Sequence, residues 1–243
     1  MSFYFEYGPE LRGQSLIMHG QIELPRRGNW FADLELDLGT LPDMQTTVRI
    51  RIFDLELMGR FKSGGNWHNR ATARIVGGAG AIFTANGTAI GTAGDISTVL
   101  PPKFYQQVPL RIPVQDALTA CGLTLDPSAS PDILNSRLTT WTRTLGPAST
   151  ALTLLLAPRG YFWRVMPTGM VGVFQEGKNY VQSVYKKDLD YQEMRYDQIQ
   201  NRYTVAVNTR MVTYEKSFSD VDPECIYHEI DSSQLRTVVW FSP

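Results

Sequence analysis

The sequence predicts an α+β fold that is mainly β, with barrel-like antiparallel β domains interrupted by a small helical insert with a β-hairpin. Apolar residues recur with a period of two in the first and last thirds of the chain, which is typical of strands with one buried face. The middle third instead carries helix start and stop signals. Because 43% of the 243 residues are hydrophobic, the chain can bury a sizeable core.

The first third is expected to form several short strands. Residues 30–38 alternate apolar and polar, and so do residues 48–52. The alternation slips by one residue at Phe53, which indicates a β-bulge or a sharp bend. A hairpin turn is expected at residues 64–66, Gly-Gly-Asn, and a further strand at residues 72–76. Short strands at this spacing favour a small barrel or sandwich.

The middle third is expected to be helical. Pro113 begins a helix that ends at Gly122, and a second helix begins at residues 130–131, Ser-Pro. The apolar stripe of this second helix has helical spacing and comprises Leu134, Leu138, Trp141 and Leu145. A third helix spans residues 149–157, and residues 161–174 form a hairpin.

Strands are expected again in the last third, at residues 203–211 and 235–241. We divide the chain into a barrel-like domain of residues 1–110, a helical insert with its hairpin of residues 111–180, and C-terminal strands of residues 181–243 that complete a second barrel-like domain. Residues 77–100, rich in Gly, Ala and Thr, are expected to form an extended loop or irregular hairpin, and long loops of this kind often carry function.

Composition and charge exclude several function classes. The formal net charge is −1 and no long block of like charge is present, whereas tight nucleic-acid binding needs a concentrated basic face. Charged residues make up only 19% of the chain, which favours a surface that other chains cover. Cys121 and Cys225 lie far apart and neither is part of a CxxC pair, so we expect neither a disulfide framework nor a zinc site.

The N-terminus lacks a basic segment followed by an apolar one, and no apolar run approaches the length of a membrane span. We therefore expect the protein to be synthesised and to fold in a cytoplasm and to have no membrane partner.

Two groups of carboxylates are candidates for chemistry. Asp33, Glu35 and Asp37 could supply the acid pair of a glycosidase, but their alternation with apolar residues indicates the solvent-facing side of a strand. The second group could bind a hard cation such as calcium and comprises Asp220, Asp222, Glu224, Glu229 and Asp231. It lacks the Gly and Glu positions of an EF-hand loop, and Pro223 favours an exposed acidic turn.

Other motifs are equally weak as sites. His19, His68 and His228 are isolated, with no HxxxH or GxSxG pattern. Residues 78–80, Gly-Ala-Gly, follow a predicted strand but precede no helix and lack the third Gly of a phosphate-binding loop. The aromatic run at residues 161–163, Tyr-Phe-Trp, could stack on a sugar, but its place in a tight hairpin favours core packing. We therefore assign no catalytic, cofactor-binding or metal-binding residue.

The order of these elements resembles the hub proteins of bacteriophage tail baseplates, a family that includes the hubs of contractile tails and related injection machines. The residues that carry the resemblance in the middle third are 112–118, 122–123, 152–156, 160–165 and the turn at Gly169. Stretches 22–33 and 73–80 add similarity in the first third.

The resemblance implies a structural protein with no enzymatic activity and no cofactor. It implies a homotrimeric ring in the tail baseplate of the virion that joins the tail tube to the spike and lets DNA pass on ejection. The implied partners are further copies of this chain, the tube, the spike, other baseplate proteins and the tape measure protein. The alternatives are a glycan-binding module, which needs exposed coplanar aromatic residues, and a tail-associated peptidoglycan or glycan hydrolase, which needs a carboxylate pair in a cleft.

Overall fold

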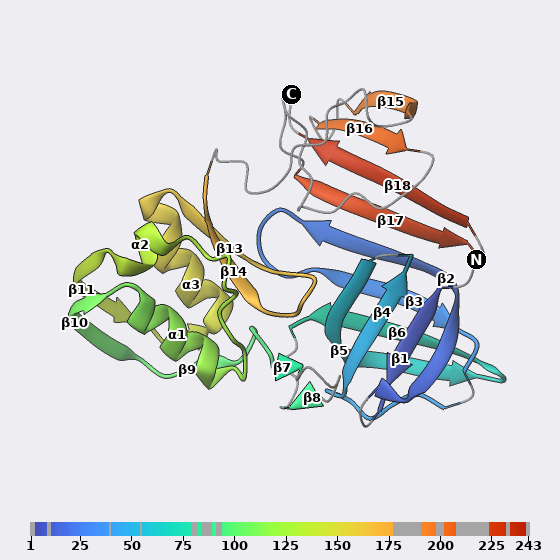
Figure 1. Cartoon of the computed structure of the whole chain (residues 1–243), viewed down its shortest axis with the longest axis horizontal. Helices are drawn as coiled ribbons and strands as arrows, with labels where there is room; N and C mark the ends of the chain where they lie inside the picture. Colours follow the sequence, from blue (N-terminus) through green and yellow to red (C-terminus); the bar gives the residue numbers. More distant parts are fainter. Residues whose placement is uncertain are drawn as a thin grey trace.

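Strands dominate the computed structural model, and ten of them form a single antiparallel sheet (Figure 1). The structure describes residues 3–8, 11–38, 40–53, 55–78, 82–83, 89–90, 94–176, 191–197, 202–207, 224–231 and 234–241. The mainly β fold that the sequence predicts is therefore confirmed.

Six strands of the sheet close into a barrel. They are β1 (Tyr4–Tyr7), β2 (Gly13–Pro25), β3 (Phe31–Leu36), β4 (Thr47–Ile52), β5 (Leu55–Trp67) and β6 (Arg70–Gly77). Their order is β1-β4-β5-β6-β3-β2, and pairing of β1 with β2 closes the ring. The inward side chains, such as Leu34, Ile50 and Leu57, are almost fully buried. Each stabilises the barrel by about 1.5–3 kcal/mol relative to an exposed position, which favours the strands whose burial alternates, β3, β4 and β6.

The long strand β2 belongs both to the barrel and to the rest of the sheet. Its residues 13–16 pair with β1, whereas residues 19–25 pair with β17 (Cys225–Asp231) along the same edge. Beyond β17 the sheet continues through β18 (Gln234–Phe241), β16 (Arg202–Val207) and β15 (Tyr191–Asp197). The C-terminal strands thus extend the barrel wall as one continuous sheet, above the barrel in Figure 1.

The insert lies to one side of the barrel (Figure 1). Its helices are α1 (Arg111–Ala120), α2 (Pro131–Asn135), α3 (Ala148–Leu156) and the 3-10 helix η2 (Ala157–Arg159). Its strands are β9 (Val99–Leu100), β10 (Lys103–Pro109), β11 (Arg137–Arg143), β12 (Gly146–Pro147), β13 (Tyr161–Val165) and β14 (Val171–Gln175). A short pair, β7 (Ile82–Phe83) with β8 (Ala89–Ile90), precedes it.

Backbone hydrogen bonds join the insert to the barrel. Gly28 N–H donates to the Trp163 carbonyl at 2.8 Å, and Val165 N–H donates to the Gly28 carbonyl at 2.9 Å. At the tip of the β13–β14 hairpin, the Pro167 carbonyl accepts a hydrogen bond from Met58 N–H of β5 at 2.7 Å. The hairpin therefore lies between the barrel wall and the helices and fixes the insert on the barrel.

The expected second helix is wrong beyond residue 135. Residues 131–135 are helical, but Ser136 has ψ 144° and the chain continues as β11 paired antiparallel with β10. Threonine-rich residues 137–143 fit a pleated strand better than a helix, because β-branched side chains favour extended backbone. Trp141 stacks on Tyr105 of β10 with ring centroids 5.7 Å apart, and Leu145 is 69% exposed, so the predicted helical stripe does not exist.

One turn prediction is confirmed and another needs correction. Of the two alternatives predicted at Phe53, the sharp bend is present: the chain reverses there, Ile52 lies opposite Leu55, and Phe53 has φ 52°. The expected turn at residues 64–66 is strand, since β5 continues to Trp67 and the reversal comes at His68, with φ 55°.

The remaining expected elements that fall on described residues are present. Helix α1 begins two residues before Pro113, and Gly122 follows its end with φ 71°, as expected. Within the glycine-rich segment, residues 79–81, 84–88 and 91–93 lie outside the described residues, as do residues 208–211 of the expected strand at 203–211. Among the described helices, none is both long and apolar enough to cross a membrane.

Candidate assembly surfaces

In the first carboxylate group, Asp33 and Glu35 lie on the outer face of β3, as their alternation predicts, and Asp37 is exposed just beyond its end. Asp33 accepts a hydrogen bond from Arg74 of the neighbouring strand β6 at 3.0 Å, and Glu35 forms an ion pair with Arg70. Both carboxylates border a hollow of about 610 Å³ on the sheet. Each is engaged by a guanidinium of the neighbouring strand, so the arrangement is that of cross-strand ion pairs.

The second carboxylate group is only partly described. Asp220 and Asp222 lie outside the described residues. Glu229 of β17 pairs with Arg236 of β18 at 3.1 Å, and Asp231 lies 3.2 Å from His19 of β2. In the described part of the chain, no group of three or more His, Cys, Asp or Glu side chains is placed to hold a metal ion.

The histidines have three different environments. His19 lies on the outer face of the sheet beside Asp231, whereas His228 is fully buried with its Nδ1 2.8 Å from the Thr237 hydroxyl. His68 lies in the β5–β6 turn, where its ring stacks on Trp67 with centroids 6.0 Å apart. The structure does not bring the three together, since one faces outward, one faces inward and one lies at a hairpin tip.

The aromatic run of the hairpin is core. Trp163 is 7% exposed and donates a hydrogen bond from its indole nitrogen to the Thr153 hydroxyl of α3 at 2.9 Å. Phe162 is buried against Phe174. The structure therefore places these rings in packing roles, as the sequence favoured, and not on an open sugar platform. Of residues 78–80, which the sequence did not favour as a phosphate loop, only Gly78 is described; its φ is 108°, and it lies against Leu123.

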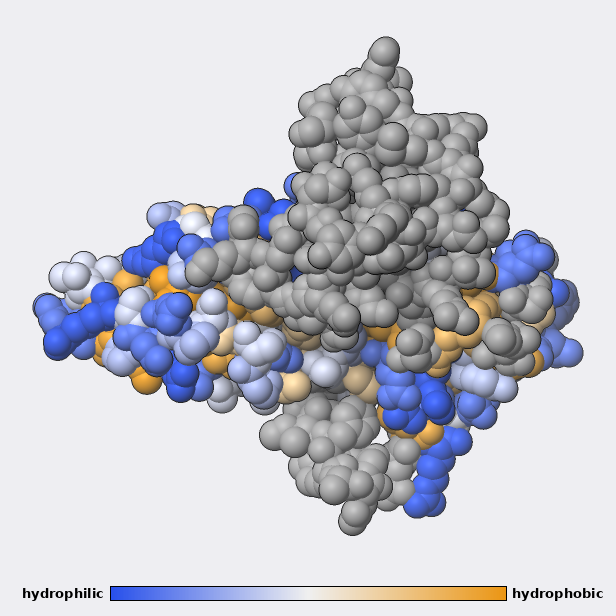
Figure 2. Space-filling view, turned by 45° about the horizontal axis from the view of Figure 1, so that its top comes forward, coloured by the Kyte–Doolittle hydropathy of each residue, from blue (hydrophilic) through white to orange (hydrophobic). Residues whose placement is uncertain are grey.

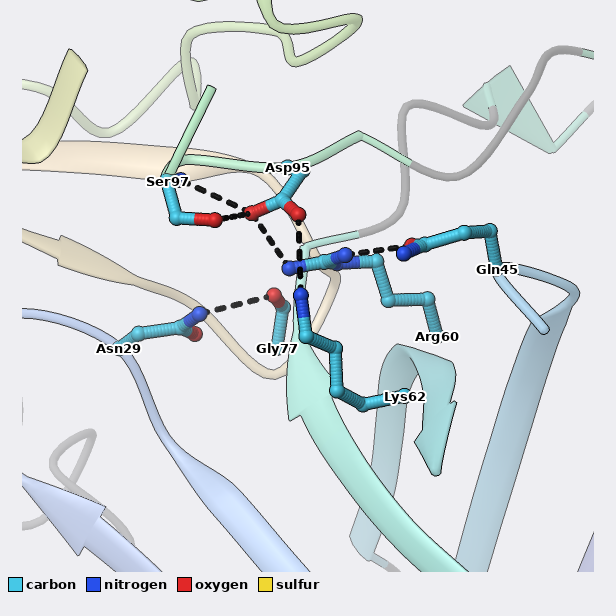
Figure 3. A network of polar contacts seen from close by, with 7 residues as sticks. All are labelled: Asn29, Gln45, Arg60, Lys62, Gly77, Asp95 and Ser97. Atoms are coloured by element: carbon cyan, nitrogen blue, oxygen red, sulfur yellow. Dashed lines mark hydrogen bonds and ion pairs between the residues drawn. The ribbon is translucent and has the colours of Figure 1, made fainter. Parts of the chain in front are cut away.

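A polar network that sequence reasoning missed connects the barrel to the insert (Figure 3). The Arg60 side chain of β5 is 3% exposed and pairs with the Asp95 carboxylate, while Gln45 accepts a further hydrogen bond from it. Lys62 approaches the other Asp95 oxygen at 3.4 Å, and Ser97 donates to Asp95 from its backbone N–H at 2.8 Å. Burial raises the pKa of Asp95, but these hydrogen bonds and nearby cations outweigh burial and hold that pKa below its usual value.

The network also organises the start of α3. Asp95 N–H donates to the Cys121 carbonyl at 3.0 Å, which ties residues 94–98 to the end of α1. The carbonyls of Ile96 and Thr98 then accept the first N–H groups of α3, each at 3.0 Å. Since helix N-termini leave unpaired donors, this segment serves as the cap that α3 lacks in its own side chains. The Arg60–Asp95 pair therefore fixes residues 94–98, and through them the end of α1 and the start of α3, relative to the barrel.

A second network lies inside the insert. The Asp116 carboxylate of α1 accepts hydrogen bonds from Lys103 at 2.6 Å and from the buried Arg143 of β11 at 3.0 Å, and it also accepts the Tyr105 hydroxyl. Burial raises the pKa of Asp116, but the hydrogen bonds from Lys103 and Tyr105 and the neighbouring charges leave it lowered. This network packs the β10–β11 ribbon onto α1.

Five exposed large apolar side chains lie on the insert. Those of residues 94–176 that are large, hydrophobic and exposed are Val99, Phe104, Ile112, Leu145 and Leu154. Figure 2 shows hydrophobic residues scattered among hydrophilic ones over this part of the molecule, at the left. On the barrel, Trp67 is 78% exposed at the β5–β6 tip. Contiguous apolar patches mark contact with other proteins, whereas single exposed apolar residues are normal on protein surfaces.

The β10–β11 ribbon has an undefended strand edge. Pro101, Pro102 and Pro109 interrupt the β9–β10 side, whereas β11 contains no proline and three threonines. Within the described residues no third strand pairs with this ribbon. Native edges that face solvent are normally protected by proline or charge, and the charges of β11 are confined to its ends, Arg137 and Arg143. The uncharged middle of β11, residues 138–142, is therefore suited to contact with another chain.

Comparison with known proteins agrees with this architecture. No family model matches the chain, and no curated protein matches it in sequence. Among solved structures, the 43 kDa tail protein of prophage MuSo2 from Shewanella oneidensis superposes with a TM-score of 0.67 at 8% identity, over 99% of this chain and 98% of that one. A tail protein from Neisseria meningitidis MC58 superposes with a TM-score of 0.64 at 9% identity, over 100% and 96%.

A third similar structure is an Escherichia coli component of the type VI secretion system, described as structurally similar to the T4 bacteriophage tail proteins gp27 and gp5. It has a TM-score of 0.64 at 8% identity, over 98% of this chain and 76% of that one. The resemblance to hub-type tail proteins that the sequence suggested is thus confirmed at the level of the fold.

Proposed function

We propose that this chain is a structural protein of a phage tail baseplate, a hub-like ring that joins the tail tube to the spike and lets DNA pass. The observation that carries the proposal is the superposition of essentially the whole chain on phage tail proteins over nearly their whole length. A match confined to the barrel would be weak support, because small barrels serve many functions. Here the barrel, the insert and the C-terminal strands are all included.

The surface of the chain supports an assembly role. The insert exposes five large apolar residues and carries the undefended edge of β11, and the barrel exposes Trp67. An enzyme would instead need a convergent set of acid, base or nucleophilic groups, and among the described candidate carboxylates Asp33, Glu35 and Glu229 are engaged in cross-strand ion pairs. We therefore propose that the protein has no enzymatic activity and no cofactor.

We infer that the assembled form is a homotrimer in the virion tail, with C-terminal residues 181–243 completing a second barrel-like domain. Two barrel-like units in each of three copies would give six similar units around the ring, which would match a sixfold tube to a threefold spike. The neighbours in this proposal are the tail tube, the spike, other baseplate proteins and the tape measure protein.

Light scattering across a concentration series, with and without candidate tail partners, tests the ring. We expect a trimer alone or in the presence of a partner, and a strictly monomeric chain under every condition would refute the proposal. Incorporation into tail particles tests the insert. Replacing Phe104 and Leu145 with Ser should reduce incorporation, whereas Met44→Ser, which changes an equally exposed barrel residue, should not.

A glycan hydrolase is the alternative that the sequence left open. Zymography on peptidoglycan at high protein concentration separates the two functions, and no clearing is expected. Clearing that disappears in Asp33→Asn would establish the hydrolase instead.

A further inference from the structure

The outer face of the sheet carries two rows of directly opposed residues. The first row crosses five strands from β18 to β6 and consists of Arg236, Glu229, Gln21, Asp33 and Arg74. The second row crosses from β17 to β6 and consists of Asp231, His19, Glu35 and Thr72. Because directly opposed residues of a sheet point to the same side, all of these side chains share one face.

Each arginine of this face is paired with a carboxylate on the neighbouring strand. Arg74 reaches Asp33 at 3.0 Å, and Arg236 reaches Glu229 at 3.1 Å. Arg70, at the end of β6, pairs with Glu35. The rows together with Arg70 contain three arginines and four carboxylates, so this face is close to neutral and slightly acidic.

The face is also hollowed. The register of β2 with β3 shifts between Ile17 and His19, and that of β5 with β6 shifts between Phe61 and Ser63. Such bulges bend the strands and increase their twist. A hollow of about 610 Å³ lies on this face and is bordered by residues of both rows, from Glu229 on one side to Ser63 on the other.

Exposed ion pairs of this kind add little to stability. Arg74 and Asp33 are 47% and 48% exposed, and Arg236 and Glu229 are 52% and 39% exposed. Pairs at such exposure contribute about 0–1 kcal/mol. Their effect on the surface potential is larger, since each carboxylate cancels a guanidinium that would otherwise bind phosphate.

We propose that this face lines the channel of the assembled ring, and that its cross-strand ion pairs neutralise the arginines so that duplex DNA passes without binding. The proposal rests on the proposed function and specifies which surface meets the DNA. The sheet that carries the face continues from the barrel into the C-terminal strands, so one wall of each copy can line the channel without a break. A face built to hold DNA would instead present arginines without carboxylate partners.

The test is fluorescence anisotropy with a labelled 20-base-pair duplex and the full chain. Wild type should not bind at about 0.1 M salt. Asp33→Asn combined with Glu229→Gln leaves Arg74 and Arg236 without their partners. This variant should bind at least about tenfold more tightly than wild type, with log K falling against log salt at a slope of about −1.8 for two phosphates.

Two matched variants separate pairing from net charge. Asp43→Asn combined with Asp132→Asn makes the same change in charge at exposed positions away from this face and should leave the duplex unbound. The swapped pair Asp33→Arg with Arg74→Asp keeps the ion pair and should also behave as wild type. Duplex binding by wild type, or equal binding by the Asp33/Glu229 and Asp43/Asp132 variants, would overturn the proposal.

The position of the face is tested in the assembled particle. Gln21 is exposed in the middle of the first row. A gold cluster attached to Gln21→Cys should appear at the channel wall by electron microscopy, and a label on the outer rim would overturn the assignment. Failure of the ring itself would be seen separately, as a monomer in light scattering.

Discussion

Asp95→Asn should destabilise the protein strongly although Asp95 lies on a loop. Its carboxylate is the charged partner of Arg60, whose side chain is 3% exposed, and asparagine keeps the size while removing the charge. Breaking a buried ion pair from one side costs about 3–5 kcal/mol. Since Asp95 is itself 22% exposed, water replaces part of the lost interaction, and we expect the lower end, about 3 kcal/mol.

Urea denaturation followed by circular dichroism measures this loss. Asp43→Asn is the control, because the same change at an exposed position should stay within about 0.5 kcal/mol of wild type. Arg60→Met should cost less than Asp95→Asn, since Asp95 keeps Lys62 and Ser97 and can be partly solvated. The two changes together should cost less than their sum. Additive costs, or an Asp95→Asn protein as stable as the Asp43 control, would show that the pair does not hold the insert to the barrel.

Three further predictions concern buried rings, lowered carboxyl pKa values and a buried thiol. Trp30→Ala should lower the unfolding free energy by about 3–5 kcal/mol because the ring is 2% exposed. Trp141→Ala should lower it clearly less because that ring is only partly buried, and thermal melts of both variants test the difference. Because the pKa values of Asp95 and Asp116 are lowered in the folded state, their stabilisation is complete above the unfolded pKa of about 3.9 and is lost as pH falls through the folded values. The melting temperature of wild type should therefore decrease at pH values below about 4. The decrease should be smaller in Asp95→Asn, which lacks one of the two carboxylates. Burial raises the pKa of the Cys121 thiol to about 11, so a thiol reagent at pH 8 should react with it only at the rate of unfolding; immediate reaction in the folded protein would contradict its burial.

The sequence predicts the barrel well because its signal is local. In β3, each inward residue is apolar and each outward one is polar or half-buried, so the period of two specifies both the strand and its buried face. The turn at Gly122 was equally predictable, because a residue with φ 71° after a helix favours glycine.

The insert was harder to predict because its strands are stabilised by tertiary contacts. Leu134, Leu138 and Trp141 have helical spacing by coincidence, and the buried positions of β11 do not alternate regularly either. Leu138 and Arg143 are both buried although they are five residues apart. The partner strand β10 changes its buried face in the same way between Tyr105 and Val108, on either side of Gln107 with φ 58°. Neither a helical period nor the period of two of a strand therefore predicts this ribbon from the sequence.

The two networks were missed for a related reason. Arg60 and Asp95 are 35 residues apart, and nothing in the sequence shows that the carboxylate folds back onto β5. The outer-face rows had a partial signal, since Asp33 and Glu35 alternate on one predicted strand and Arg70 and Arg74 occur around another. Strand pairing had to be known before the acids and bases could be matched.

Burial separates charges that hold the fold from charges that shape the surface. Arg60 and Arg74 both pair with an aspartate, but the first side chain is 3% exposed and the second 47%. Removing the aspartate leaves a buried guanidinium in one case and a hydrated one in the other. Asp33→Asn should therefore change the unfolding free energy by less than about 1 kcal/mol while increasing the affinity of the sheet for phosphate groups. If Asp33→Asn proved as destabilising as Asp95→Asn, the outer-face pairs would be explained by their contribution to stability. The proposal that they serve to neutralise the arginines would then lose its support.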